Sequence, residues 1–252
     1  MTRIILSGAL GKMGKAITSC VNNRNDCEIV AGVDIADSEC SFPIFKSFNE
    51  ITVDADVIID FSHPSVLADL LAFAKEKKVP AVIATTGLNE EQIESIKVTS
   101  DDVPLFFSAN MSIGVSLVSE LAKKAAKVLQ GSFDIEIVEA HHNQKIDAPS
   151  GTALMLADSI SEALDEKPIY EFDRHSKRMK RTKNEIGIHA VRGGDIVGDH
   201  TVMFVGDGER LEIKHQAHTR EVFIAGVIRA IRYAPTAEKG VVSSMNDVLG
   251  LE

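Results

Sequence analysis

Residues 139–153 carry the groups in this chain that are most suited to proton transfer. They include the adjacent imidazoles of His141 and His142 and, three positions later, the amine of Lys145. An imidazole changes its charge near neutral pH, and a lysine ammonium can donate a proton or bind an anion. This combination predicts a site that moves protons to or from a small anionic molecule.

A helix is expected to begin within the same segment. Ser150, Gly151 and Thr152 follow a proline, and apolar residues come after them at helical spacing. The first backbone N–H groups of such a helix can bind an anion. Residues 135–138 predict a short β-strand that delivers the two histidines to the same place as this helix start.

Two plainer interpretations of these residues compete with proton transfer. Successive side chains on a strand face opposite sides, so one histidine of the pair could have a structural role. A metal site built from His141, His142 and Asp147 lacks a second ligand cluster, and Lys145 would lie beside the cation. We therefore expect no metal ion, and we expect Asp147 to orient Lys145 or to cap the turn.

The first strand candidate, residues 3–7, leads into a glycine-rich turn. Its glycines have the spacing G-x-x-G-x-x-G, and apolar residues follow at helical intervals. A strand, a glycine turn and a helix start together predict a binding site for the pyrophosphate of a dinucleotide. We expect coenzyme contacts from the whole turn, which comprises Gly8, Ala9, Leu10, Gly11, Lys12, Met13 and Gly14.

The second strand candidate, residues 28–34, bears on the choice of coenzyme. It ends in Asp34, where a carboxylate accepts hydrogen bonds from the adenosine ribose. Asp34 would repel a 2′-phosphate and Ile35 offers no cation, which favours NAD, whereas Lys12 could hold that phosphate. We expect NADH and NADPH both to serve, with NADH no worse than NADPH.

Three further strand candidates end in small polar residues, as the ligand-facing edge of a parallel sheet does. They cover residues 57–60, 81–84 and 105–108. The residues expected to contact ribose and nicotinamide at this edge are Ala84, Thr85, Thr86, Ser108, Ala109, Asn110 and Met111.

The pattern changes after residue 112. A long helix is expected near residues 115–129, and strand candidates follow at residues 186–190, 201–204 and 211–215. The expected fold is α/β, with a Rossmann-like parallel sheet in a dinucleotide-binding domain of residues 1–112 plus 221–252. Residues 113–220 are expected to form a second, substrate-binding α+β domain built on an open mixed sheet.

The composition argues against several classes of protein. A formal net charge of −10 and the absence of tryptophan oppose nucleic-acid binding. No apolar run approaches about 18 residues and no signal-peptide pattern is present, so we expect no membrane association and a cytoplasmic location. One basic run, residues 174–183, could bind phosphate, but a solvated loop is the favoured interpretation.

The chain resembles the dihydrodipicolinate reductase family, the 4-hydroxy-tetrahydrodipicolinate reductases of bacterial lysine and diaminopimelate biosynthesis. The segments that carry the resemblance are residues 8–14, 85–87, the segment around Asn110, 139–153 and 192–201. Three positions depart from the family pattern. Ala84 stands where many relatives have glycine, Met111 where phenylalanine is often expected, and Ile35 where a cation is frequent.

The resemblance implies a reaction and roles for individual residues. A reduced nicotinamide would deliver hydride to a cyclic dicarboxylate, with His141 as proton donor or acceptor and Lys145 as proton donor. His142, Gly151 and Thr152 would bind the carboxylates of the substrate. The resemblance also implies a homotetramer assembled through the sheet of the second domain.

Two functions from other classes remain open at this point. A dehydrogenase acting on an open-chain amino acid such as aspartate would fit residues 1–110 but would leave residues 139–153 unexplained. A noncatalytic dinucleotide sensor would need no proton donor and would tend to carry a separate binding module, which the sequence does not reveal.

Overall fold

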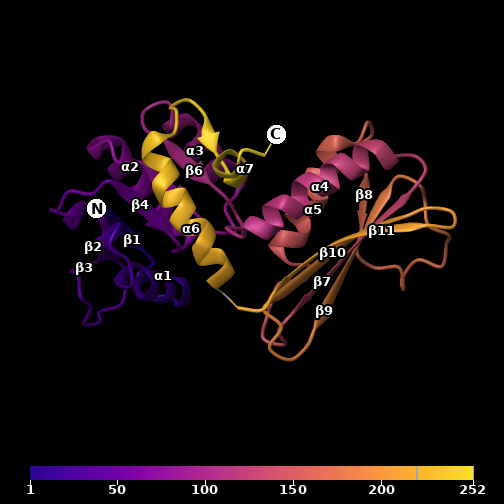
Figure 1. Ribbon diagram of the computed structural model, residues 1–252, viewed down its shortest axis with the longest axis horizontal. Helices are drawn as coiled ribbons and strands as arrows, with labels where there is room; N and C mark the ends of the chain where they lie inside the picture. Colours follow the sequence, from indigo (N-terminus) through magenta and orange to yellow (C-terminus); the bar gives the residue numbers. More distant parts are fainter. Residues whose placement is uncertain (220, 252) are drawn as a thin grey trace. The chain divides into compact units, whose positions relative to one another are not determined.

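The computed structural model describes residues 1–219 and 221–251, which form two compact units (Figure 1). Unit 1 comprises Met1–Met111 and Phe223–Leu251, and unit 2 comprises Ser112–Val222. The C-terminal segment therefore completes the first unit instead of extending the second. Among the described residues, no helix is long and apolar enough to cross a membrane.

Unit 1 is built on a seven-stranded sheet with the order β12-β6-β5-β4-β1-β2-β3, in which the paired strands run parallel. Ile4, Ile5 and Leu6 are fully buried, as expected of a parallel strand covered on both faces. The strands are β1 (Thr2–Ser7), β2 (Cys27–Val33), β3 (Ile44–Phe45), β4 (Val57–Asp60), β5 (Ala81–Ile83), β6 (Leu105–Phe107) and β12 (Val242–Ser243).

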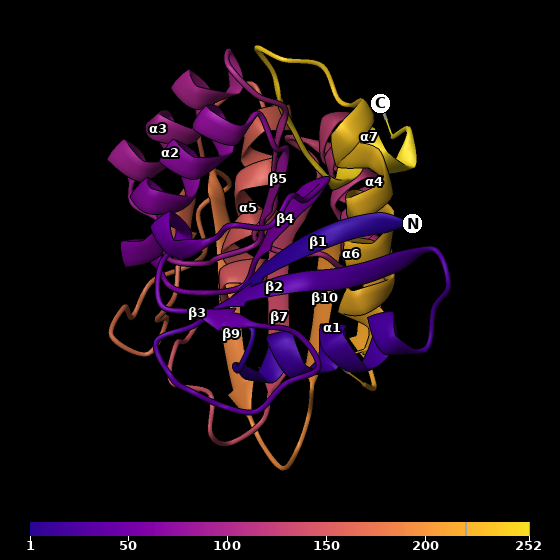
Figure 2. The ribbon, with the colours of Figure 1, turned by 90° about the vertical axis from the view of Figure 1, so that its left-hand side faces the viewer.

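Helices cover both faces of this sheet. Figure 2 shows α2 and α3 on one side of the strands and α6 on the other. The helices are α1 (Lys12–Asn22), α2 (Leu67–Lys77), α3 (Glu90–Ser100), α6 (Glu221–Tyr233) and α7 (Met245–Leu249), with short 3-10 turns η1 (Phe48–Glu50), η2 (Pro64–Val66) and η3 (Ala234–Thr236). Because the strands run parallel, their carboxyl ends meet at one edge of the sheet, where α1 also begins.

Unit 2 is built on a mixed five-stranded sheet with the order β11-β10-β7-β9-β8. β10 runs antiparallel to both β7 and β11, whereas β9 runs parallel to β7 and β8. The strands are β7 (Asp134–His141), β8 (Ile169–Glu171), β9 (Glu185–Arg192), β10 (Gly198–Val205) and β11 (Arg210–Ala217).

Two helices, α4 (Ile113–Leu129) and α5 (Gly151–Ala163), pack together on one face of this sheet (Figure 1). Side chains of β7 alternate between this face and the other one, so that Ile135 and Ile137 enter the core beside Leu156 and Ile160. The same alternation points Glu139 and His141 toward the helices.

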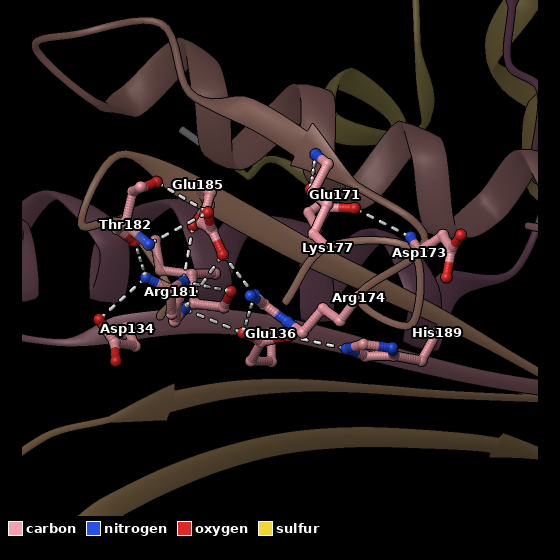
Figure 3. Close-up of polar contacts among 11 residues, drawn as sticks. Asp134, Glu136, Glu171, Asp173, Arg174, Lys177, Arg181, Thr182, Glu185 and His189 are labelled. Atoms are coloured by element: carbon pink, nitrogen blue, oxygen red, sulfur yellow. Dashed lines mark hydrogen bonds and ion pairs between the residues drawn. The ribbon is translucent and has the colours of Figure 1, made fainter. Parts of the chain in front are cut away.

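Three short strands, β3, β8 and β12, were not predicted from the sequence, because two or three residues give too little periodicity to recognise. The basic run proved to be only partly solvated. Arg174 and Arg181 form ion pairs with Glu136 (Figure 3). Arg178, Lys180 and Lys183 are exposed.

Candidate active site

The glycine-rich turn is so tight that two of its glycines have no room for a side chain. A β-carbon on Gly14 would lie 2.2 Å from the carbonyl oxygen of Gly8, and one on Gly8 would lie 2.5 Å from that of Phe61. Gly8 also has a positive φ of 76°, which glycine adopts without strain. The turn thus presents bare backbone at the start of α1, an arrangement that fits a pyrophosphate.

Asp34, directly after β2, supports this turn. Its carboxylate oxygens accept hydrogen bonds from the N–H of Leu10 at 2.9 Å and from the N–H of Ala36 at 3.0 Å. Each carboxylate oxygen has a second lone pair that can accept a ribose hydroxyl. The residue predicted to bind the ribose therefore also fixes the loop in front of the phosphate position.

A pocket of about 450 Å³ lies against the glycine turn. Its lining includes Gly8, Gly11, Asp34, Lys46, Ser62 and His63. The pocket combines the bare turn with the acid at the end of β2, which is where an adenosine half of a dinucleotide binds in this class of sheet.

Lys46 is a residue of this pocket that the sequence analysis missed. β3 pairs with β2 so that Phe45 lies opposite Val33, and the residues that follow the two strands become neighbours. The Nζ atom of Lys46 lies 2.5 Å from Asp37 Oδ1 and donates a hydrogen bond to the carbonyl oxygen of Ile35 at 3.1 Å. A cation is thus present beside the position of Ile35, supplied by a different strand.

Thr85, one of the predicted coenzyme contacts, uses its side chain within the protein. Its hydroxyl donates to the buried carboxylate of Asp60 at 2.6 Å and accepts the N–H of Ser62 at 3.1 Å. These bonds tie the ends of β4 and β5 together. Contacts from this position to a ligand would come from the backbone or from the exposed Thr86.

The remaining predicted contacts lie at the end of β6. Ser108 donates its hydroxyl hydrogen to the carbonyl oxygen of Asn110 at 2.7 Å, and Ala109 is exposed. Met111 is buried, and its carbonyl oxygen lies against Gly226 of α6, where a β-carbon would come within 1.8 Å. The side chain of Met111 is therefore enclosed by protein.

In unit 2, His141 lies at the end of β7 with its ring against the carboxylate of Glu139. The two residues are 8 % and 0 % exposed, and His141 Nδ1 lies 2.6 Å from Glu139 Oε2. When Nδ1–H donates to the carboxylate, Nε2 is the ring atom that can exchange a proton with a ligand. A β-carbon at Gly198 would lie 3.1 Å from this Nε2, so glycine keeps the space beside it open.

Glu139 binds four hydrogen-bond donors. Besides His141, its oxygens accept from Nη1 and Nη2 of Arg192, both at 2.8 Å, and from the N–H of Ser150 at 3.0 Å. Burial alone would raise the pKa of the Glu139 carboxyl, but the bonds from Arg192, His141 and Ser150 lower it below its ordinary value. The carboxylate is therefore ionised at neutral pH.

Arg192 extends this network to Lys145. Its Nη2 also donates to the carbonyl oxygen of Asp147 at 2.6 Å, and Asp147 Oδ1 lies 2.8 Å from Lys145 Nζ. Of the two roles expected for Asp147, orienting Lys145 or capping the turn, this ion pair favours the first. His142 is partly exposed, and its carbonyl oxygen accepts the N–H of Lys145 at 3.1 Å, which closes the turn between them.

The start of α5 agrees with the prediction. Ser150 is the N-cap, and its hydroxyl oxygen accepts the N–H of Ala153 at 3.2 Å. Gly151 and Thr152 form the first helical positions, so their N–H groups point toward the N-terminal end of the helix. On the other side, Ser150 Oγ lies 3.1 Å from Nε2 of His200, a buried histidine on β10.

Unit 2 thus connects groups of residues 139–153 with one another, and adds Arg192 from β9 and His200 from β10. The arrangement can donate a proton through an imidazole and bind anionic groups with an ammonium and a helix start. Among residues 1–219 and 221–251, no three histidine, cysteine, aspartate or glutamate side chains are arranged to hold a metal ion.

Sequence profiles of one family match both units. The profile described as "Dihydrodipicolinate reductase, N-terminus" matches residues 2–111, and "Dihydrodipicolinate reductase, C-terminus" matches residues 114–249. The chain belongs to the dihydrodipicolinate reductase family. Membership, together with the Rossmann-like sheet, makes it an oxidoreductase with a nicotinamide coenzyme.

Individual relatives agree with this family. A protein of Clostridium tetani named 4-hydroxy-tetrahydrodipicolinate reductase is 51% identical over 96% of this chain and 94% of its own length. A protein of the same name from Clostridium novyi is 47% identical over 99% of this chain and 98% of its own length. The solved structure of a dipicolinate-bound dihydrodipicolinate reductase from Paenisporosarcina sp. TG-14 has a TM-score of 0.80 and 26% identity, covering 98% of this chain and 99% of that one.

More distant solved structures share the architecture only. An aspartate dehydrogenase from Thermotoga maritima has a TM-score of 0.54 and 14% identity, covering 92% of this chain and 95% of that one. This similarity shows the fold alone. Family membership therefore decides against the two alternatives left open by the sequence, an aspartate-type dehydrogenase and a noncatalytic sensor.

Proposed function

We propose that this chain reduces 4-hydroxy-tetrahydrodipicolinate to tetrahydrodipicolinate, with NADH or NADPH as the reductant. The observation that carries the proposal is the buried contact of His141 with Glu139 beside the start of α5. It supplies a proton donor next to a binding site for carboxylates. The overall reaction consumes one hydride and one proton and releases the 4-hydroxyl group as water.

Loss of the 4-hydroxyl group as water leaves a conjugated imine in the six-membered ring, to which a bound reduced nicotinamide would supply a hydride. Electron density then develops on the neighbouring ring atoms and must take up a proton, so an acid is required. His141 fills this role through Nε2, since its Nδ1 faces Glu139. Lys145 acts as a second proton donor and as a positive charge for the substrate.

The substrate carries two carboxylates into a protein with a formal net charge of −10, so local positive potential must attract it. His142 and the N–H groups of Gly151 and Thr152 bind these carboxylates in the proposal. The helix start of α5 contributes its partial positive charge to the same place. The dipicolinate bound in the Paenisporosarcina protein is itself a cyclic dicarboxylate, which supports this choice of ligand.

Both coenzymes are expected to serve, with NADH no worse than NADPH. Residues 8–14 would bind the pyrophosphate, Asp34 the ribose hydroxyls, and residues 84–86 and 108–111 the nicotinamide half. The carboxylate of Asp34 disfavours the 2′-phosphate of NADPH. The ammonium of Lys46, which forms an ion pair with Asp37, could bind that phosphate. Of the two candidate cations, Lys46 lines the pocket and Lys12 does not.

We further propose a homotetramer formed through the sheet of unit 2. In Figure 1 both described helices of this unit, α4 and α5, lie on one face of the sheet, which leaves the other face for a second copy. The composition also leads us to propose a cytoplasmic location without a nucleic-acid partner.

A coupled assay tests the proposed reaction. Aspartate semialdehyde and pyruvate are supplied with the upstream synthase, this protein is added with NADH or NADPH, and the loss of reduced coenzyme is followed. Consumption that depends on both the synthase and this protein is the expected result. A flat trace with both coenzymes would reject the proposed substrate.

A further inference from the structure

We infer that Glu139 is the positioning residue of this site, and that its ion pair with Arg192 couples the proton donor to the groups that bind the substrate. This inference rests on the proposed function, because it assigns a task within that reaction. Glu139 itself lies at 0 % exposure beneath His141 and is not expected to touch the substrate.

Each bond of Glu139 reaches a different part of the site. One oxygen is bonded to His141, and the other accepts the N–H of Ser150, the residue that caps α5. Arg192 binds both oxygens and also holds the carbonyl oxygen of Asp147, whose carboxylate pairs with Lys145. One carboxylate therefore fixes the imidazole, the helix start and, through Arg192, the ammonium.

The charges around His141 decide whether Glu139 favours or disfavours the protonated imidazole. Glu139 faces the ring from β7, Arg192 from β9 and His200 from β10, while α5 contributes the N-cap Ser150. Of these groups, only Glu139 carries a negative charge. Its carboxylate stabilises the protonated imidazole that the reaction requires, and it compensates the guanidinium of Arg192.

Strand β7 offers a matched control on its opposite face. Glu136 accepts hydrogen bonds from Arg174 at 3.1 Å and Arg181 at 3.0 Å, and it lies 2.8 Å from Nε2 of His189 (Figure 3). It thus has the same kinds of partners as Glu139 but contacts none of the proposed catalytic groups. Both glutamates lie on β7. Replacing either one by glutamine removes one negative charge from a network with arginine and histidine side chains.

The test compares Glu139→Gln with Glu136→Gln by measuring kcat and kcat/KM across pH. Glutamine at position 139 removes the negative charge and leaves Arg192 uncompensated, and both changes disfavour the protonated His141. We expect kcat to fall by about 10²-fold, as for other losses of orientation. The pH at which kcat/KM falls on the basic side should move to lower pH, because the carboxylate 2.6 Å from His141 Nδ1 is gone. Coenzyme Kd should be unchanged.

Glu136→Gln is expected to retain the kcat and the pH profile of the wild type, whatever its effect on thermal stability. A Glu139→Gln enzyme that behaves like Glu136→Gln would overturn the inference. If Glu139→Gln does not fold, Glu139→Asp tests the inference in its place. Aspartate keeps the negative charge, but its shorter side chain moves the carboxylate away from His141, Arg192 and Ser150. That variant should lose kcat while keeping the basic limb in place, and wild-type kinetics would refute the inference.

The two proposals fail in different ways. If the wild-type protein consumes no coenzyme in the coupled assay, the proposed function is wrong. If the wild type is active and the two glutamine variants are indistinguishable, only the role of Glu139 is wrong.

Discussion

His141 and His200 lie edge to face, with their ring centroids 5.2 Å apart and their planes at 74°. Burial lowers the pKa of His200 to about 4, and repulsion from His141 acts in the same direction. His200 is therefore neutral at pH 7 and can hold the hydroxyl of Ser150 without competing for the positive charge of the site.

This histidine makes folding stability depend on pH. The pKa of His200 is lowered from 6.5 in the unfolded chain to about 4, so the unfolded chain binds the extra proton between these values. Stability is present above pH 6.5 and is lost as pH falls, by about 3 kcal/mol at pH 4. Urea unfolding between pH 4.5 and 6.5 should show a smaller loss for His200→Gln than for the wild type. Equal slopes would contradict a buried neutral His200.

Replacing the proposed acid should reduce turnover without affecting the coenzyme. His141→Gln removes the proton donor, and the loss of a general acid typically costs on the order of 10²–10⁴ in rate. Stopped-flow or steady-state kcat, together with coenzyme titration by fluorescence, would measure the two effects separately. Wild-type turnover in this variant would remove His141 from the mechanism.

The ammonium of Lys145 is expected to matter for both binding and turnover. Lys145→Ala removes a positive charge from the carboxylate site and a proton donor, so KM for the substrate should rise and kcat should fall. The paired carboxylate offers a comparison, because Asp147→Asn keeps the ammonium but removes its ion pair. A normal KM in Lys145→Ala would show that this residue does not bind the substrate.

Gly151 provides a test of the helix start that leaves the fold intact. Apart from the two chain neighbours of Gly151 and the nearby backbone of its own helix, no protein atom lies within 4 Å of a β-carbon built there, so alanine fits without a clash. In the proposal a substrate carboxylate approaches the N–H groups at this point, and the added methyl group would obstruct it. Gly151→Ala should raise substrate KM about tenfold, the effect of losing a charged hydrogen bond, with unchanged Tm. An unchanged KM would place the carboxylate elsewhere.

Lys46 should decide how well NADPH is used. Lys46→Gln removes the ammonium beside Ile35, so kcat/KM for NADPH should fall about tenfold while kcat/KM for NADH stays within about twofold. Lys12→Gln serves as the comparison, because Lys12 was the phosphate ligand suggested by the sequence. If Lys12→Gln alone lowers the NADPH value, the assignment to Lys46 is wrong.

Local patterns in the sequence determined much of this protein. The glycine turn, the cap at Ser150 and the helix after it follow from the conformations that neighbouring residues allow. The pairing of Glu139 with His141 was also within reach, because residues two apart on a strand share a face. The proton-transfer segment could therefore be recognised before any tertiary contact was known.

Only the tertiary structure decided which distant groups join these segments. Arg192 binds Glu139, 53 positions away in the sequence, because β9 pairs with β7. The antiparallel register of β10 places His200 opposite Glu139. Lys46 comes beside Ile35 through the pairing of β3 with β2, while Thr85 turns to Asp60. Strand register depends on packing of the whole sheet, and a slip of one residue reverses every side chain, so no local pattern specifies these contacts.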